Sequence, residues 1–176
     1  MKRLMGLAAG AAALTLALTG CANYSQPATS APTGGSAAAP ALASAGKLTV
    51  CTHLAYKPFQ FKDDAGKIVG FDVDLMDLVA KKLGVTQDIV DIDFGQITSG
   101  AVFTAKKCDA GAAAITITDE RNAAAPFSDP YFAATQALLV KTDSGIMGLE
   151  DLKGKILAVQ TDTTGQKYAE DHKAEY

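Results

Sequence analysis

The segment TITDERNAAAPFSDPYF (Thr116–Phe132) places one arginine, Arg121, among small and apolar residues that follow a predicted buried strand. A guanidinium stays charged when partly buried and presents paired donors in one plane, which suits a carboxylate. Two partners are open from these residues alone: a ligand carboxylate, or a surface ion pair with Asp119 or Glu120. Thr118 is expected to cap the helix that begins here, with both acids in its first turn.

A second segment that can do chemistry is TDTTGQKYAEDHKAEY (161–176), which is predicted to open a helix with hydroxyls at its N-terminus. Backbone N–H groups and the helix dipole make such an N-terminus a natural anion site, with Thr163 and Thr164 as its candidate residues. The structural alternative is simple N-capping by these threonines, and the two interpretations are compatible.

The sequence shows no signature of catalysis. The nucleophile-elbow pattern G-x-S-x-G is absent, and no carboxylate pair is singled out. His53 and His172 are too far apart for a local metal motif. We therefore expect no catalytic residue, no metal and no cofactor. An enzyme stays the alternative, because one fold can host both binding proteins and enzymes.

Strand and helix patterns alternate from Lys47 onward, which indicates an α/β unit with parallel strands. The expected elements are a strand at Lys47–His53, a helix within 66–84, a strand at Ile89–Phe94, a helix at Gln96–Lys107 and a buried strand of small residues at 108–116. The first helix has acids such as Asp72 at its start, lysines in its last turn and Gly84 after it, as the helix dipole and a glycine stop favour.

Ligands gather beyond the carboxyl ends of parallel strands. His53, Phe94 and Thr116 lie at those predicted ends, and Arg121 follows closely, so the pattern brings these residues toward one place. Further along, we expect an extended run at 133–141, a short helix and turn at 149–155, and a strand at Ile156–Gln160. These elements indicate a second α/β unit that includes the helix after Thr163.

The N-terminus has the parts of an export signal: Lys2 and Arg3, the apolar run Leu4–Leu18, and small residues before a cut site. A membrane-spanning anchor would need about 20 apolar residues. The tetrapeptide LTGC that ends at Cys21 resembles the lipobox of bacterial lipoproteins, which implies that Cys21 becomes the acylated N-terminus. Residues 22–46 are uncharged and rich in Ala, Ser, Pro, Gly and Thr, and we expect a flexible linker there.

Of the 16 basic residues, Lys2 and Arg3 belong to the signal, so 14 remain against 19 acidic ones, a net charge of −5. Without a basic stripe, we expect no nucleic-acid partner and no adhesion to anionic lipid. Export makes a disulfide between Cys51 and Cys108 chemically possible. It requires a strand register with Cα atoms within about 7 Å, and the sequence leaves this open.

Three segments in order, CTHLAYKPFQFKDDAGKIVGFDVDLMDLVAKKLG, TITDERNAAAPFSDPYF and LEDLKGKILAVQTDTTGQKYA, resemble the polar amino-acid-binding proteins of ABC importers. The resemblance implies a two-lobed, Venus-flytrap periplasmic-binding fold of type II, with mostly parallel sheets flanked by helices. The implied organisation is a signal peptide at 1–20, a lipidated Cys and linker at 21–46, lobe 1 at 47–134 and the start of lobe 2 at 135–176.

The resemblance also implies roles for individual residues. Arg121 matches the arginine that holds the ligand α-carboxylate, and Thr163 and Thr164 match the groups that complete its cradle. Thr116 matches a contact to the ligand amino group, and Ala114 a wall position that offers only its backbone. The remaining positions are aromatic walls at Tyr56 and Phe94, and a ligand contact at His53, whereas Phe59 is expected to pack within the lobe.

The sequence departs from the family pattern at three places. His53 stands where relatives that bind cationic amino acids often have aspartate, so a Lys or Arg ligand would lack that ion partner. Asp162 stands where many relatives have glycine, which places a negative charge near a carboxylate site. The family's acidic residue for the ligand α-amino group lies beyond Tyr176, so the resemblance implies a C-terminally truncated chain with an incomplete second lobe.

The function implied is that of an ABC transporter's solute-binding component, which captures an amino acid between its lobes and delivers it to the permease. We expect a monomer on the outer face of the cytoplasmic membrane, anchored by lipid at Cys21. The alternatives are an enzyme on the same fold, such as an amino-acid-like dehydratase, or a ligand-sensing domain.

Overall fold

The computed structural model describes residues 40–175, which belong to one compact unit. The predicted signal peptide, Cys21 and most of the predicted linker lie outside the described residues, and the predicted domain boundaries stay predictions. No helix among residues 40–175 is long and apolar enough to cross a membrane.

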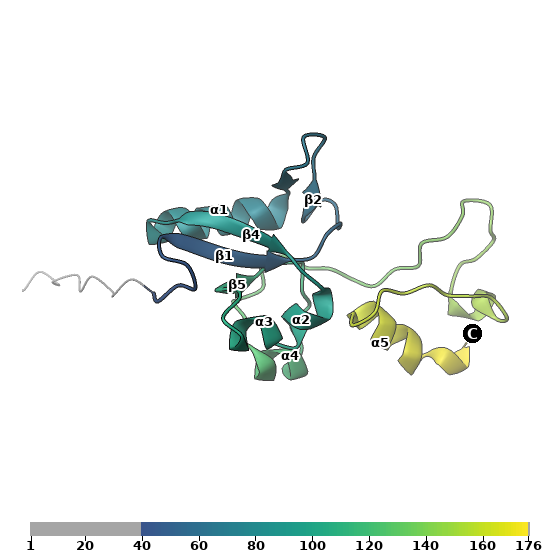
Figure 1. The fold of residues 1–176 in the computed structure, drawn as a ribbon. Coiled ribbons are helices and arrows are strands. Elements are labelled where there is room, and N and C mark those ends of the chain that lie inside the picture. The colour runs from purple at the N-terminus through teal and green to yellow at the C-terminus, as the bar shows by residue number, and fades with distance from the viewer. Residues whose placement is uncertain (1–39, 176) are drawn as a thin grey trace, which may run out of the picture. The chain divides into compact units, whose positions relative to one another are not determined.

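The core is a three-stranded parallel sheet with the strand order β4-β1-β5 (Figure 1). The central strand β1 (Lys47–Thr52) is buried from its second residue to its last, as a strand with neighbours on both edges should be. It pairs with β4 (Thr86–Asp91) along its whole length and with β5 (Ala110–Gly111) at Val50 and Cys51. The predicted first strand and the parallel arrangement are confirmed.

Helix α1 (Phe71–Leu83) covers one face of this sheet and confirms the first predicted helix. Its Ala80 and Met76 pack against Leu48 and Val50 of β1. The helix ends at Gly84, which has φ 71° and thus takes the left-handed conformation that glycine adopts without strain. A small antiparallel hairpin of β2 (Phe61–Lys62) and β3 (Ile68–Val69) precedes it.

The opposite face is covered by two short helices where the sequence predicted one. Helices α2 (Phe94–Thr98) and α3 (Ala101–Thr104) are separated at Gly100, whose φ of 75° interrupts the helical path. Their Ile97 and Val102 pack with Cys51.

The predicted strands Ile89–Phe94 and 108–116 are also corrected. The first begins earlier and ends at Asp91, and Asp93 caps α2 by accepting a hydrogen bond from the Gln96 N–H. Phe94 therefore opens a helix. The second shortens to β5, and further along Ala114 has φ 48°, so the strand conformation does not continue to Thr116.

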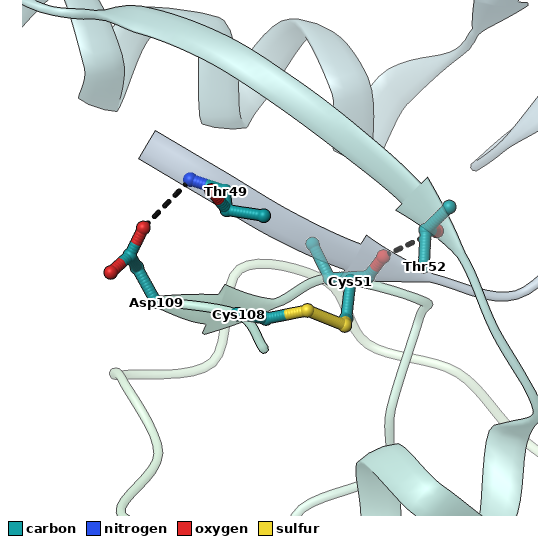
Figure 2. Close-up of a disulfide and its surroundings, with 6 residues drawn as sticks. Thr49, Cys51, Thr52, Cys108 and Asp109 are labelled. Atoms are coloured by element: carbon teal, nitrogen blue, oxygen red, sulfur yellow. Dashed lines mark hydrogen bonds between the residues drawn. A yellow bond between two sulfur atoms is a disulfide. The ribbon is translucent and has the colours of Figure 1, made fainter. Parts of the chain in front are cut away.

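Cys51 and Cys108 form a disulfide with a Cα–Cα distance of 5.7 Å (Figure 2). The bond joins β1 to the segment that enters β5 and answers the question that the sequence left open. Next to it, the Asp109 carboxylate accepts the Thr49 N–H at 2.8 Å, and the Thr52 hydroxyl donates to the Ala112 carbonyl at 2.7 Å. A structural disulfide fits a protein that folds in an oxidising compartment.

After α4 (Asp119–Ala124) the chain runs without regular structure to a 3-10 turn, η1 (Leu149–Leu152), as the short-helix prediction required. The predicted strand Ile156–Gln160 is wrong. No described strand pairs with it, and Ile156 is 97% exposed. Helix α5 (Thr164–Asp171) then confirms the predicted helix, followed by η2 (Lys173–Glu175).

Candidate ligand-binding site

The predicted ligand residues meet at one cavity of about 290 Å³. This volume lies at the lower end of the range for small-molecule sites. All eight predicted positions line it: His53, Tyr56, Phe94, Ala114, Thr116, Arg121, Thr163 and Thr164. The structure therefore brings every residue of the predicted site together, and their roles toward a ligand stay predictions.

The parallel sheet explains why five of these residues converge. His53 follows β1 directly, and Phe94 follows β4 at the start of α2. Ala114 and Thr116 follow β5, and Arg121 lies in the next helix, α4. The carboxyl ends of parallel strands open at the same edge, so residues distant in the sequence reach one cavity.

Arg121 is held by hydrogen bonds to two segments that are far apart in the sequence. Its side chain is largely buried, with the residue 9% exposed. Nη1 donates to the Thr116 carbonyl at 3.0 Å, and Nη2 donates to the Asp162 carbonyl at 2.8 Å. The guanidinium carbon lies 5.6 Å from the centre of the Phe94 ring, a cation–π distance. These contacts use two of its five N–H donors, which leaves others for a ligand.

Arg121 has no ion-pair partner among the described residues. The alternative of a surface ion pair with Asp119 or Glu120 is therefore not what the structure contains. Burial lowers the pKa of Arg121, and the charges of Glu120 and Asp162 act against that change. An arginine remains a cation at neutral pH even so. The cavity thus contains a positive charge whose neutralising partner is still open.

The local structure of α4 confirms the predicted cap. The Thr118 hydroxyl accepts the Arg121 N–H at 3.2 Å, and Asp119 and Glu120 occupy the first turn. Capping orients this short helix and so directs the arginine side chain toward the cavity.

The second predicted arm is the N-terminus of α5. Thr163 is its N-cap, because its hydroxyl accepts the Gln166 N–H at 3.0 Å and donates to the Gln160 carbonyl at 2.7 Å. The Thr164 hydroxyl lies 3.2 Å from that of Thr116 and accepts from Gln136 Nε2 at 3.1 Å. The capping interpretation is confirmed, and the first residues of α5, Thr164 and Gly165, line the cavity together with the cap Thr163.

Two aromatic residues of the predicted wall differ in exposure. Tyr56 is 53% exposed, whereas Phe94 is partly buried against the Cys51 cluster. Phe59 is buried and lies within ring contact of Tyr56 and Phe132, with centroids 5.3 Å and 5.0 Å away. The prediction that Phe59 packs within the lobe is confirmed.

The sequence interpretation missed the role of Asp72. We assigned it to the helix dipole, but it is 1% exposed, and its Oδ2 accepts the Ala114 N–H at 2.7 Å. That hydrogen bond holds Ala114 in its left-handed conformation at the cavity wall. Burial raises the pKa of the Asp72 carboxyl, and the Ala114 hydrogen bond opposes that change. The only signal in the sequence was the position of an acid directly after a predicted core helix began.

The backbone conformation at Asp162 explains why this position, where many relatives have glycine, can also hold an aspartate. It has φ 63°, a left-handed conformation in which glycine is unstrained and Asp is tolerated. Its carbonyl accepts from Arg121, and its carboxylate lies against Gly95, where an added Cβ would be 2.6 Å from Oδ2. The negative charge that the sequence placed near the site is therefore at the start of α2.

Residues 48–173 match the bacterial extracellular solute-binding proteins, family 3. The chain belongs to this family, and its fold is of the periplasmic-binding type. Membership of an extracellular family indicates an extracytoplasmic location.

Particular relatives are amino-acid-binding proteins. The chain is 34% identical to the arginine-binding extracellular protein ArtP of Bacillus subtilis (strain 168), over 94% of this chain and 59% of that protein. It is 46% identical to the solved structure of an ancestral arginine-binding protein bound to arginine, with a TM-score of 0.64 over 72% of this chain and 57% of that one. The ancestral amino acid-binding protein AncCDT-1, a precursor of cyclohexadienyl dehydratase, is 39% identical, with a TM-score of 0.69 over 74% of this chain and 58% of that one. The chain thus spans less than three fifths of the length of each of these relatives.

Proposed function

We propose that this protein binds an amino acid in the cavity and delivers it to the permease of an ABC importer. The observation that carries this proposal is Arg121, a buried cation at the cavity wall with no ion-pair partner among the described residues. A ligand carboxylate is the partner that such a guanidinium recognises best.

The rest of the cavity suits the two ends of an amino acid. The first-turn N–H groups of α5 add donors for the α-carboxylate beside Arg121, as helix N-termini do for anions. The Thr116 hydroxyl and the Ala114 carbonyl are acceptors for the α-amino group. Tyr56 and Phe94 provide aromatic surface for the ligand side chain.

Arg121 already joins two distant segments, because its hydrogen bonds reach Thr116 and Asp162. A ligand carboxylate bound by Arg121 and the start of α5 would favour the arrangement in which these segments are close. The ligand thereby shifts the population toward a closed state, which the permease would recognise. We further propose a monomer anchored to the membrane by lipid at Cys21, a residue outside the described part of the chain.

An enzyme is the second candidate, because one similar structure is described as a precursor of cyclohexadienyl dehydratase. That structure is itself named an amino acid-binding protein. A binding protein returns the amino acid unchanged after hours of incubation, whereas a dehydratase consumes its substrate. Product analysis by mass spectrometry separates the two functions.

Calorimetry of the purified protein against the amino acids tests the proposal. Arg121→Ala should weaken the tightest ligand by at least about 30-fold, the loss expected when one partner of a buried charge pair is removed. Lys81→Ala is the matched control, since Lys81 is a surface cation paired with Asp77 at 2.7 Å. Unfolding curves check that Arg121→Ala still folds. Unchanged affinity in this variant would refute the carboxylate assignment.

A further inference from the structure

His53 is held in one orientation at the cavity wall. Its backbone carbonyl accepts a hydrogen bond from Gln60 Nε2 at 3.0 Å, and Gln60 is almost fully buried. Its ring Nδ1 lies 2.8 Å from the carbonyl oxygen of Ile92, the residue directly after β4. Backbone and ring are thus each attached to a fixed part of the fold.

The Ile92 contact determines which ring nitrogen carries the proton. A carbonyl oxygen only accepts hydrogen bonds, so Nδ1 must be the donor. In the neutral imidazole, Nε2 then has no hydrogen and is an acceptor. No described residue forms a hydrogen bond with Nε2. In the neutral ring, Nε2 is therefore an acceptor on a cavity-lining residue, and no described residue donates to it.

Phe94 relates this acceptor to the proposed carboxylate site. The His53 ring centre lies 6.0 Å from the Phe94 ring centre, and the Arg121 guanidinium carbon lies 5.6 Å from it. A ligand whose carboxylate binds Arg121 can extend its side chain along Phe94 toward His53. Because His53, Phe94 and Arg121 line the same cavity, Nε2 is a candidate partner for the far end of that side chain.

We infer that His53 determines specificity by accepting a hydrogen bond at Nε2 from an N–H group of the ligand side chain, which selects carboxamide or guanidinium side chains. This inference rests on the proposed amino-acid-binding function. A carboxylate side chain would place lone pairs against the Nε2 lone pair, and an apolar side chain would leave Nε2 unsatisfied. A site built to bond an N–H group rejects analogues that lack it.

The two side-chain classes differ in charge. Among the described residues that line the cavity, Arg121 is the one permanent charge, and none is a carboxylate. A carboxamide supplies N–H donors without adding charge, whereas a guanidinium adds a second cation. Comparing the affinities for glutamine and for arginine therefore shows whether a carboxamide or a guanidinium supplies the N–H donor.

Calorimetry with glutamine, arginine, glutamate and methionine tests the inference, because glutamine and glutamate have the same shape and methionine lacks a donor. The tighter of glutamine and arginine should bind at least about tenfold tighter than both glutamate and methionine. His53→Phe keeps a ring but removes both nitrogens, and it should reduce the affinity advantage of that tighter ligand over methionine to less than about threefold. His53→Gln returns an acceptor oxygen and should restore part of this affinity advantage.

His172→Phe is the matched control, since its Nδ1 also lies 2.8 Å from a backbone carbonyl, that of Tyr168, but the residue does not line the cavity. It should leave all four affinities unchanged. Preference of the unmodified protein for glutamate or methionine, or an unchanged preference in His53→Phe, overturns this inference alone. Failure of every amino acid to bind overturns the proposed function and the inference with it.

Discussion

Replacing Cys51 and Cys108 by alanine removes the covalent link between β1 and the segment that enters β5. The two residues are 57 positions apart, and freeing a loop of that length in the unfolded chain returns conformational entropy worth about 4 kcal/mol at 25 °C. Domains of this size are commonly stable by about 5–15 kcal/mol. The double variant should therefore lose a large share of its stability, because the linked strand is the centre of the sheet.

Urea unfolding of the protein from Ala22 onward, followed by circular dichroism, measures this loss. Cys51 and Cys108 are both buried, so the alanines also leave small cavities that add to the cost. The reduced unmodified protein separates the two effects, because it keeps both sulfur atoms and lacks only the link. We expect it to be less stable than the oxidised form by about 4 kcal/mol, and the alanine variant to be less stable still. Equal urea midpoints for the oxidised and reduced forms would refute the assignment of this stability to the disulfide.

Two further predictions concern acidic residues near the site. Burial raises the pKa of the Asp72 carboxyl above its unfolded value of 3.8, so the folded protein binds the carboxyl proton more tightly than the unfolded chain does. The contribution of Asp72 to the free energy of unfolding therefore falls as the pH rises from 3.8 through the folded-state pKa. Asp72→Asn keeps an oxygen for the Ala114 N–H, so it should flatten that part of the pH dependence and raise stability at neutral pH, and parallel profiles in urea unfolding would contradict this. Asp162→Gly removes a carboxylate whose field reaches Arg121 and suits the left-handed backbone there, so calorimetry should show amino-acid binding tighter by about three- to tenfold, whereas weaker binding would show that the carboxylate assists the site.

Elements with strong local signals were predicted well from the sequence. Helix α1 has an apolar stripe, a favourable charge order and a glycine stop, all within one stretch of chain. The caps at Thr118 and Thr163 need only a hydroxyl and an N–H three residues later. Periodicity and capping act over a few residues, so the sequence contains the information directly.

Predictions failed where a backbone conformation or a distant partner decides the outcome. The break between α2 and α3 depends on Gly100. The predicted strand 108–116 cannot continue through Ala114, whose left-handed conformation is held by Asp72 from 42 residues away. The segment Ile156–Gln160 has the composition of a strand, but no described strand pairs with it. A strand forms only when its backbone groups find partners, which composition does not report.

The sequence by itself determined the alternating α/β order, the family resemblance and the eight residues that meet at the cavity, because each follows from local pattern or motif. Only the tertiary structure decided that Cys51 and Cys108 are bonded, that Arg121 is buried without an ion-pair partner among the described residues, and that His53 directs its proton to Ile92. The reason is physical: bonding, burial and tautomer depend on atoms brought together from distant parts of the chain, and their distances exist only in the folded state.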